Sequence, residues 1–147
     1  MRKLIFCLFI FCSYTVFATE TEAHQFAGKH FLASYLDCDV EALRNLDELI
    51  VAMDKAVEAS HATILDKASY RFEPDAITIV YLLSESHASI HTYPEYGACF
   101  IDLFTCGDTC SSVKFDEMLR EYLKPKTVDA RLFLRSNQTA EAPLAKE

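Results

Sequence analysis

The sequence predicts an α+β fold, a two-layer sandwich in which a largely antiparallel β-sheet carries two main helices on one face. Two observations lead to this class. Short β-prone segments fill most of the chain, and only two segments repeat apolar residues at helical spacing. The 147 residues are 51% hydrophobic with only three Gly and four Pro, which suits a single folded core. We expect one domain over residues 19–135.

The first strand and the first helix are expected on either side of Asp39. Residues 29–39 mix aromatic and apolar side chains as a strand does, and Asp39 is a candidate N-cap. From Val40 onward, apolar residues recur every three or four positions, at Leu43, Leu46, Ile50, Met53 and Val57. This spacing predicts an amphipathic helix that packs on a sheet.

Four strands should follow, over residues 62–72, 76–84, 88–93 and 98–104, separated by turns that contain Pro74 and Pro94. The segment 76–84 is almost continuously apolar, so it is expected to be buried on both faces. A second helix is predicted over 113–123, with an apolar face of Val113, Phe115, Met118, Leu119 and Tyr122. A last strand over 127–135 and a polar tail over 136–147 complete the chain.

Residues 1–18 have the layout of a secretory signal peptide. Arg2 and Lys3 precede an apolar run that ends at Val16-Phe17-Ala18, and polar residues follow. A retained span would need about 20 apolar residues, and no second stretch is long enough. We expect export, periplasmic or secreted, with no membrane span in the mature chain; an uncleaved anchor, or a different start that leaves the protein cytoplasmic, stays open.

Charge and cysteine spacing argue against two classes of partner. The formal net charge is −8, which gives no electrostatic reason to expect nucleic acid. After residues 1–18, the remaining cysteines are Cys38, Cys99, Cys106 and Cys110, which could form two disulfides in an oxidising compartment. Because they contain no CxxC pair or other strong zinc spacing, we expect no metal.

Residues 82–108 concentrate chemically useful side chains in one β-prone stretch. They read LLSESHASIHTYPEYGACFIDLFTCGD. Taken singly, Ser84 and Ser86 could be turn residues, His87 and His91 partly exposed strand residues, and Cys106 a buried apolar group. No GxSxG elbow surrounds either serine, so a hydrolase is not indicated.

As a string, residues 83–108 resemble the processing and active-site segment of the bacterial S-adenosylmethionine decarboxylase proenzymes, the short pyruvoyl-dependent class. The resemblance extends to residues 28–39 and 70–74 and covers roughly residues 28 to 135. It implies self-cleavage between Glu85 and Ser86, which converts Ser86 into a pyruvoyl group that forms a Schiff base with the substrate. It implies neither pyridoxal phosphate nor a metal.

The resemblance also assigns roles to other residues. His91 would accept a proton during maturation, Thr78 would support it, and Cys106 would return a proton to the substrate. Phe72, Tyr93 and Glu95 would bind the substrate, although Phe72 could instead be a core residue and Glu95 a turn carboxylate. Ser86 lies an odd number of residues from His91, so the two converge only if the strand begins irregularly, at a strained turn.

Three features depart from the family pattern. Tyr93 stands where the family has Trp, Ala76 replaces a Gly, and Thr78 occupies a Ser position. Thr retains the hydroxyl but is stiffer at χ1, so slower maturation is expected. In an oxidising compartment a Cys106–Cys110 disulfide would also remove the proton donor.

The expected function is S-adenosylmethionine decarboxylation, which supplies the aminopropyl donor for spermidine. The resemblance implies a homodimer of processed protomers, forming a larger αββα sandwich. Two alternatives stay open. An exported enzyme would be short of S-adenosylmethionine, which leaves a pyruvoyl-dependent arginine or ornithine decarboxylase. Thr78 and the replacement of a Gly by Ala76 leave an uncleaved, exported, non-catalytic paralogue.

Overall fold

A computed structural model describes residues 27–106 and 109–136. The elements are β1 (Ala27–Leu36), α1 (Val40–Arg44), α2 (Leu46–Ala59), β2 (Ile64–Arg71), β3 (Ile77–Leu83), β4 (Ser86–Tyr93), the 3-10 helix η1 (Pro94–Tyr96), β5 (Ala98–Thr105), α3 (Ser112–Leu123) and β6 (Thr127–Ser136). The predicted signal peptide, residues 1–18, and the tail beyond Ser136 lie outside the described residues.

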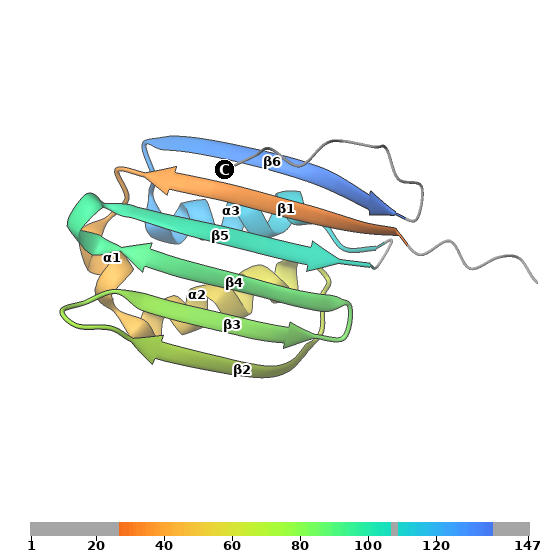
Figure 1. Ribbon diagram of the computed structural model, residues 1–147, viewed down its shortest axis with the longest axis horizontal. Coiled ribbons are helices and arrows are strands. Elements are labelled where there is room, and N and C mark those ends of the chain that lie inside the picture. Colours follow the sequence, from red (N-terminus) through yellow and green to blue (C-terminus); the bar gives the residue numbers. More distant parts are fainter. Residues whose placement is uncertain (1–26, 107–108, 137–147) are drawn as a thin grey trace, which may run out of the picture.

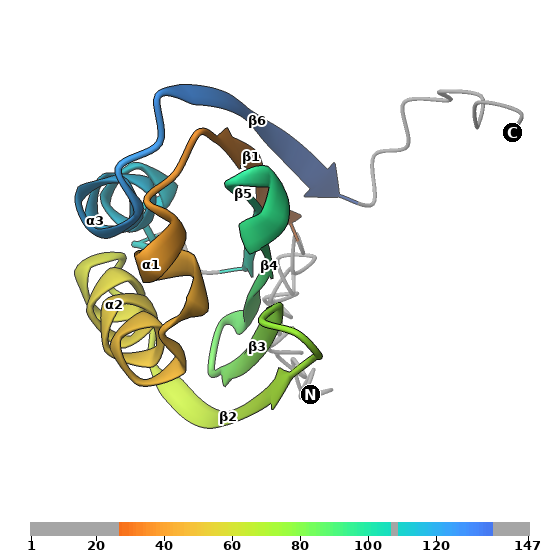
Figure 2. The same cartoon turned by 90° about the vertical axis from the view of Figure 1, so that its left-hand side faces the viewer.

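The six strands form one sheet in the order β2-β3-β4-β5-β1-β6. Every neighbouring pair is antiparallel. Strands β2 to β5 follow one another along the chain, whereas β1 lies between β5 and the C-terminal β6 (Figure 1). All three α-helices lie on one face of this sheet, as the side view in Figure 2 shows. The predicted α+β two-layer sandwich is confirmed.

One core fills the space between the sheet and the helices. Strand residues alternate between the two faces, and those that face the helices pack against the apolar sides of α2 and α3. The largest fully buried side chains are Tyr35, Tyr81, Phe115, Leu43, Leu49, Met53, Ile77, Ile79, Ile90, Leu103, Leu119 and Leu123. Burying each such aliphatic or aromatic side chain contributes about 1.5–3 kcal/mol. The core therefore fixes the helices and leaves the other face of the sheet free.

The predicted helix after Asp39 is two helices. Asp39 caps α1, since its carboxylate accepts hydrogen bonds from the Glu41 and Ala42 amides. Asn45 then adopts an extended conformation (φ −86°, ψ 94°) and caps α2 by accepting from the Glu48 amide. An Asn side chain that bonds the backbone in this way ends one helix and starts the next. The apolar periodicity continues across the break, which is why it predicted one helix.

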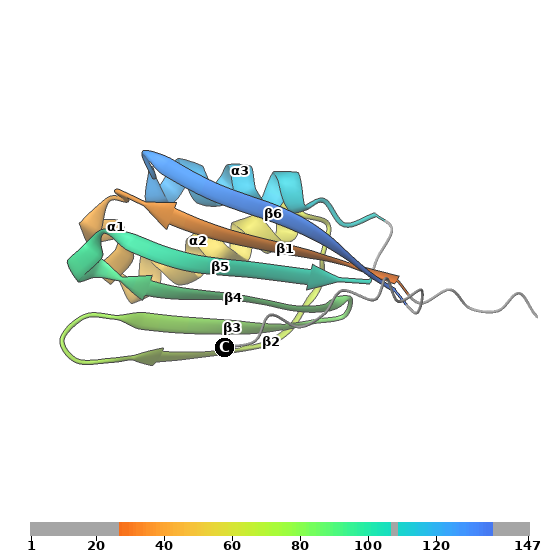
Figure 3. The same cartoon turned by 45° about the horizontal axis from the view of Figure 1, so that its top comes forward.

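The outer face of the sheet is open and carries many apolar side chains, contrary to the prediction that the third strand is buried on both faces. In β3 buried and open residues alternate, and Val80 and Leu82 are 44% and 55% exposed. No element among the described residues covers this face (Figure 3). The exposed apolar side chains of neighbouring strands on the same face are Leu32, Leu36, Tyr70, Phe100 and Phe133.

Two smaller observations complete the fold. Val113, predicted on the apolar face of the second helix, is 63% exposed and so lies outside that face, whereas Phe115, Leu119 and Leu123 are buried. Among the described residues, none of the helices combines the length and hydropathy that a bilayer span requires.

Candidate active site

The candidate residues separate into two clusters at opposite ends of β4. Glu85, Ser86 and Cys106 lie where β4 begins and β5 ends; we call them the cleavage cluster. Phe72, Thr78, His91 and Tyr93 lie where β4 ends and β3 begins; we call them the aromatic cluster. Figure 1 shows the two ends of β4.

The backbone of the cleavage cluster is irregular and internally hydrogen-bonded. Ser86 has a φ of 151°, a conformation that an L residue adopts only under constraint. The carbonyl oxygen of Glu85 accepts a hydrogen bond from the Cys106 amide at 3.0 Å. Strand β4 therefore begins irregularly at Ser86, where the sequence predicts a strained turn. The amide of Cys106 polarises the carbonyl of Glu85.

The Glu85 side chain is held by Thr63, a residue that no sequence pattern singled out. One carboxylate oxygen accepts from the Thr63 amide at 2.8 Å, and the other accepts from the Thr63 hydroxyl at 3.3 Å. The Thr63 carbonyl in turn accepts from the Ser84 amide at 2.9 Å. Thr63 lies in the connection between α2 and β2, so only the tertiary fold brings it to the hairpin. It anchors both residues that precede Ser86.

The aromatic cluster centres on His91. Thr78 and His91 are directly opposite each other on β3 and β4, and Thr78 Oγ1 lies 2.5 Å from His91 Nδ1. The His91 ring is 4.5 Å from the Tyr93 ring and 5.7 Å from the Phe72 ring, both in edge-to-face geometry. Phe72 is 42% exposed, so it is not a core residue. Glu95 follows in η1 and is also exposed.

One protomer does not bring the two clusters together. Five strand residues at about 3.3 Å each separate Ser86 from His91 by roughly 16 Å. The irregular φ at Ser86 does not close that gap, and the Ser86 hydroxyl lies instead 3.1 Å from Nδ1 of His87. Within one chain, the register of β3, β4 and β5 prevents the convergence of Ser86 and His91 that an irregular strand start was expected to allow.

The four described thiols are all free. Cys106 is exposed at the end of β5, whereas Cys110 is buried and directs its thiol toward the His61 carbonyl at 3.9 Å. Burial raises the pKa of Cys110, and Glu85 adds to the effect. Cys38 and Cys99 are hydrogen-bonded to each other in the core, which lowers the pKa of Cys38 and raises that of Cys99. Of the four, Cys106 is the thiol that a substrate can reach.

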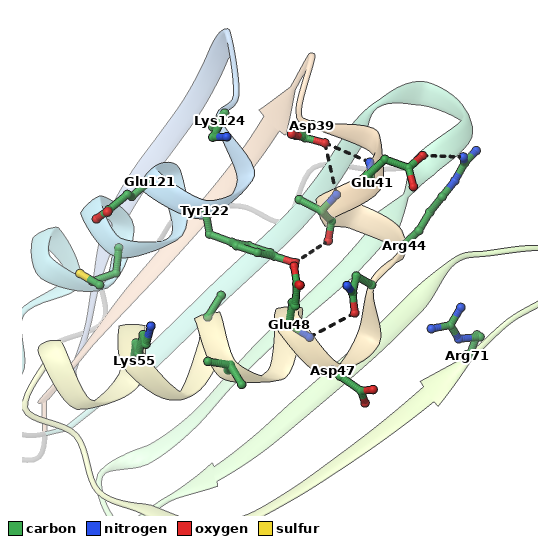
Figure 4. A pocket seen from close by; sticks show the side chains of 15 residues that line it. Asp39, Glu41, Arg44, Asp47, Glu48, Lys55, Arg71, Glu121, Tyr122 and Lys124 are labelled. Carbon is green, nitrogen blue, oxygen red and sulfur yellow. Dashed lines mark hydrogen bonds and ion pairs between the residues drawn. The ribbon is translucent and has the colours of Figure 1, made fainter.

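A groove of about 970 Å³ lies elsewhere, among the three helices. Figure 4 shows it between α1, α2 and α3, where Tyr122 donates a hydrogen bond to the Ala42 carbonyl. Its lining carries both signs of charge, among them Asp47, Lys55 and Arg71. None of the residues in the two clusters lines it. The groove is therefore separate from the chemistry expected at β4.

Comparisons with known proteins point to a single family. A family model described as S-adenosylmethionine decarboxylase matches residues 29–136. The chain is similar to the S-adenosylmethionine decarboxylase proenzymes of Thermosipho africanus (40% identity over 74% of this chain and 83% of that one), Synechococcus (40%; 81% and 93%) and Thermotoga maritima (43%; 69% and 78%).

A solved structure resembles the whole described fold. The crystal structure of the adenosylmethionine decarboxylase from Aquifex aeolicus superposes with a TM-score of 0.72 at 29% identity, covering 81% of this chain and 98% of that one. Family match, sequence identity and fold thus agree over the same residues. The chain belongs to the S-adenosylmethionine decarboxylase family.

Proposed function

We propose that the protein is a self-processing, pyruvoyl-dependent S-adenosylmethionine decarboxylase. The observation that carries the proposal is the cleavage cluster: a carbonyl polarised by the Cys106 amide precedes a serine held at a φ of 151°. Strained backbone next to a hydroxyl nucleophile suits a bond that the chain cuts itself. Family membership and the proenzyme names of its relatives point the same way.

Self-cleavage would proceed by attack of the Ser86 hydroxyl on the Glu85 carbonyl carbon. The carbonyl oxygen becomes an oxyanion, and the Cys106 amide, 3.0 Å away, donates a hydrogen bond to it. Collapse breaks the C–N bond and leaves an ester. Loss of the α-proton of residue 86 then expels the Glu85 carboxylate, and hydrolysis of the resulting dehydroalanine gives a pyruvoyl group and ammonia. Thr63 holds Glu85 in place through these steps.

A pyruvoyl carbonyl supplies the electron sink that decarboxylation of an α-amino acid needs, in the role that pyridoxal phosphate has elsewhere. Cys106 would then return a proton to the α-carbon, because its thiol is exposed beside residue 86. The rings of Phe72 and Tyr93 would stack on the adenine and attract the sulfonium charge, and Glu95 would bind the ribose. The product would serve as the aminopropyl donor for spermidine.

A second copy of the chain would complete the site. The two clusters lie roughly 16 Å apart on one antiparallel sheet. A two-fold axis through the outer face would place the aromatic cluster of one protomer against the cleavage cluster of the other. The exposed Val80, Leu82 and Phe100 side chains on that face would be buried by such a partner, giving an αββα sandwich.

Intact mass before and after borohydride reduction tests the processing. Two chains divided at Glu85–Ser86 are expected, and the second should gain two hydrogens at its terminal ketone. The matched Ser86→Ala variant should remain a single chain. The same spectrum reports whether residues 1–18 are removed, as export predicts. A wild-type chain that stays uncut and unreduced would contradict the proposal and leave a non-catalytic protein.

Carbon dioxide release then identifies the substrate. Carboxyl-labelled S-adenosylmethionine, arginine and ornithine are each offered to the processed protein, with Ser86→Ala as the blank. Release from S-adenosylmethionine alone is expected. Release only from arginine or ornithine would retain the pyruvoyl chemistry and reject this substrate.

A further inference from the structure

Two histidines and an aspartate converge on the outer face of the sheet, outside the residues assigned above. His30 on β1 and His87 on β4 both lie opposite Phe104 of the intervening β5, and Asp102 is the next outward-facing residue of β5. In a single protomer their side chains are 22%, 44% and 22% exposed, and in the proposed dimer this face lies against the second sheet. Three neighbouring strands therefore present two imidazoles and one carboxylate to the same point.

Two of the three spacings between donor atoms match a tetrahedral metal ion. Nε2 of His30 and Nε2 of His87 each lie 3.5 Å from the same oxygen of Asp102, Oδ2. The three ligand atoms all lie within 4.8 Å of one another. Metal–ligand bonds of about 2.05 Å at tetrahedral angles would separate neighbouring ligands by about 3.4 Å. Octahedral geometry would require a shorter separation, about 2.9 Å.

Hydrogen bonds from neighbouring residues orient the donor side chains, as they usually do for metal ligands in proteins. Ser89 donates a hydrogen bond to the other oxygen of Asp102, and in the uncut chain the Ser86 hydroxyl lies 3.1 Å from Nδ1 of His87. A proton on that Nδ1 leaves the Nε2 lone pair free to coordinate. Nε2 of His30 is shielded from solvent and makes no hydrogen bond to any described residue. A buried polar atom of this kind calls for a partner.

We propose that His30, His87 and Asp102 bind one Zn²⁺ ion with an open fourth position. Imidazole nitrogens with one carboxylate favour zinc over calcium or magnesium, which prefer oxygen ligands. Cysteine spacing gave no sign of this site, because its ligands come from three separate strands. In the uncut chain His87 would coordinate the ion through Nε2 while its Nδ1 contacts the Ser86 hydroxyl, so the metal site would adjoin the cleavage cluster.

One neighbouring charge opposes a cation here. The Arg135 guanidinium on β6 lies 4.5 Å from the centre of the Phe104 ring, and the His30 and His87 rings lie 5.3 and 5.6 Å from that same ring. Its charge repels a metal ion and would attract an anion. Arg135→Gln therefore distinguishes the two ligand classes: it should tighten zinc binding, whereas it would weaken the binding of an anion such as phosphate.

The test is a titration of the tag-free, full-length protein after chelator treatment. Co²⁺ serves as the probe because tetrahedral Co²⁺ gives much stronger visible bands than octahedral Co²⁺, and Zn²⁺ should displace it. One Co²⁺ per chain with tetrahedral bands is expected. His30→Gln and Asp102→Asn should weaken binding at least about 100-fold, and Ser89→Ala about tenfold, as expected for loss of a ligand and of its support.

His61→Asn is the matched control, because His61 is exposed and outside the cluster, and Asn tolerates its φ of 64°. Circular dichroism of each metal-free variant confirms that it folds; if His30→Gln fails to fold, Asp102→Asn and Ser89→Ala decide. Absence of Co²⁺ binding to the wild type would overturn the proposal. So would equal binding by wild type and ligand variants, or tighter phosphate binding with no metal.

Discussion

We expect Thr78 to hold the His91 ring in the orientation and tautomer that self-cleavage needs. Its hydroxyl makes the 2.5 Å contact with Nδ1 of His91, at a position where the family pattern has Ser. Thr78→Val keeps the shape and removes the hydroxyl, so His91 is no longer held in one orientation and tautomer. Loss of such a hydrogen bond is worth about 1.5 kcal/mol, which corresponds to roughly tenfold slower self-cleavage. A time course of the uncut chain after cell-free synthesis measures this rate.

Thr78→Ser is the matched control for this prediction. Ser retains the hydroxyl and is less restricted at χ1, so cleavage should be as fast as in the wild type or faster. If Thr78→Val and the wild type mature at the same rate, Thr78 is only a strand residue.

At this scale the sequence predicted residue types better than their partners. The string around Ser86 was specific enough to identify the family and to mark Glu85, Ser86, His91 and Cys106 as candidates. Thr63 could not be predicted as a site residue, because its role consists of contacts with Glu85, 22 residues further along the chain. No local pattern encodes a contact of that kind.

The contact between α3 and α1 should make stability fall at alkaline pH. Tyr122 on α3 donates to the Ala42 carbonyl on α1, and burial, reinforced by Glu48 and Asp39, raises its pKa to about 12. A tyrosine in the unfolded chain has a pKa near 10. Between these values the unfolded chain binds fewer protons than the native one, so the free energy of unfolding decreases as pH rises.

Tyr122→Phe should be less stable than the wild type at pH 7 but more stable than it near pH 12. At pH 7 it loses about 1 kcal/mol with the hydrogen bond, but its stability should decline less steeply from pH 10 to 12. Tyr35 and Tyr81, whose pKa values burial also raises, supply the remaining decline. Urea denaturation at several pH values measures the slopes. Tyr96→Phe is the control, since Tyr96 is 77% exposed. If the stability of Tyr122→Phe declines with pH as steeply as that of the wild type, Tyr122 is not the group responsible.

Element order could be predicted from periodicity, but the interruptions and pairings could not. Alternation and helical spacing located six strands and the helical segments to within a few residues. The break at Asn45 was missed because the apolar period continues through it. The position of β1 between β5 and β6 depends on contacts between distant parts of the chain, which a periodic pattern does not report.

At the scale of the whole molecule, the prediction that β3 is buried on both faces is wrong for a single protomer. The run of apolar residues in 76–84 is real, yet Val80 and Leu82 face outward in a single protomer. The apolar run would be buried on both faces if a second sheet packed on the outer face. It therefore agrees with the dimer that we propose rather than with the isolated chain.

Co-expression of two inactive variants tests whether the site spans two chains. Ser86→Ala lacks the proposed nucleophile and His91→Ala lacks the proposed base, so each should remain uncut alone. In a mixed dimer, Ser86 of the His91→Ala chain faces the intact aromatic cluster of the other protomer, and that chain should be cut. With random pairing and equal expression, about half of the His91→Ala chains enter mixed dimers, the common two-fold arrangement. Intact mass identifies the cut chain. If no chain is cut although the dimers form, each protomer carries out its own cleavage, and the roughly 16 Å between Ser86 and His91 would have to be closed by movement within one sheet.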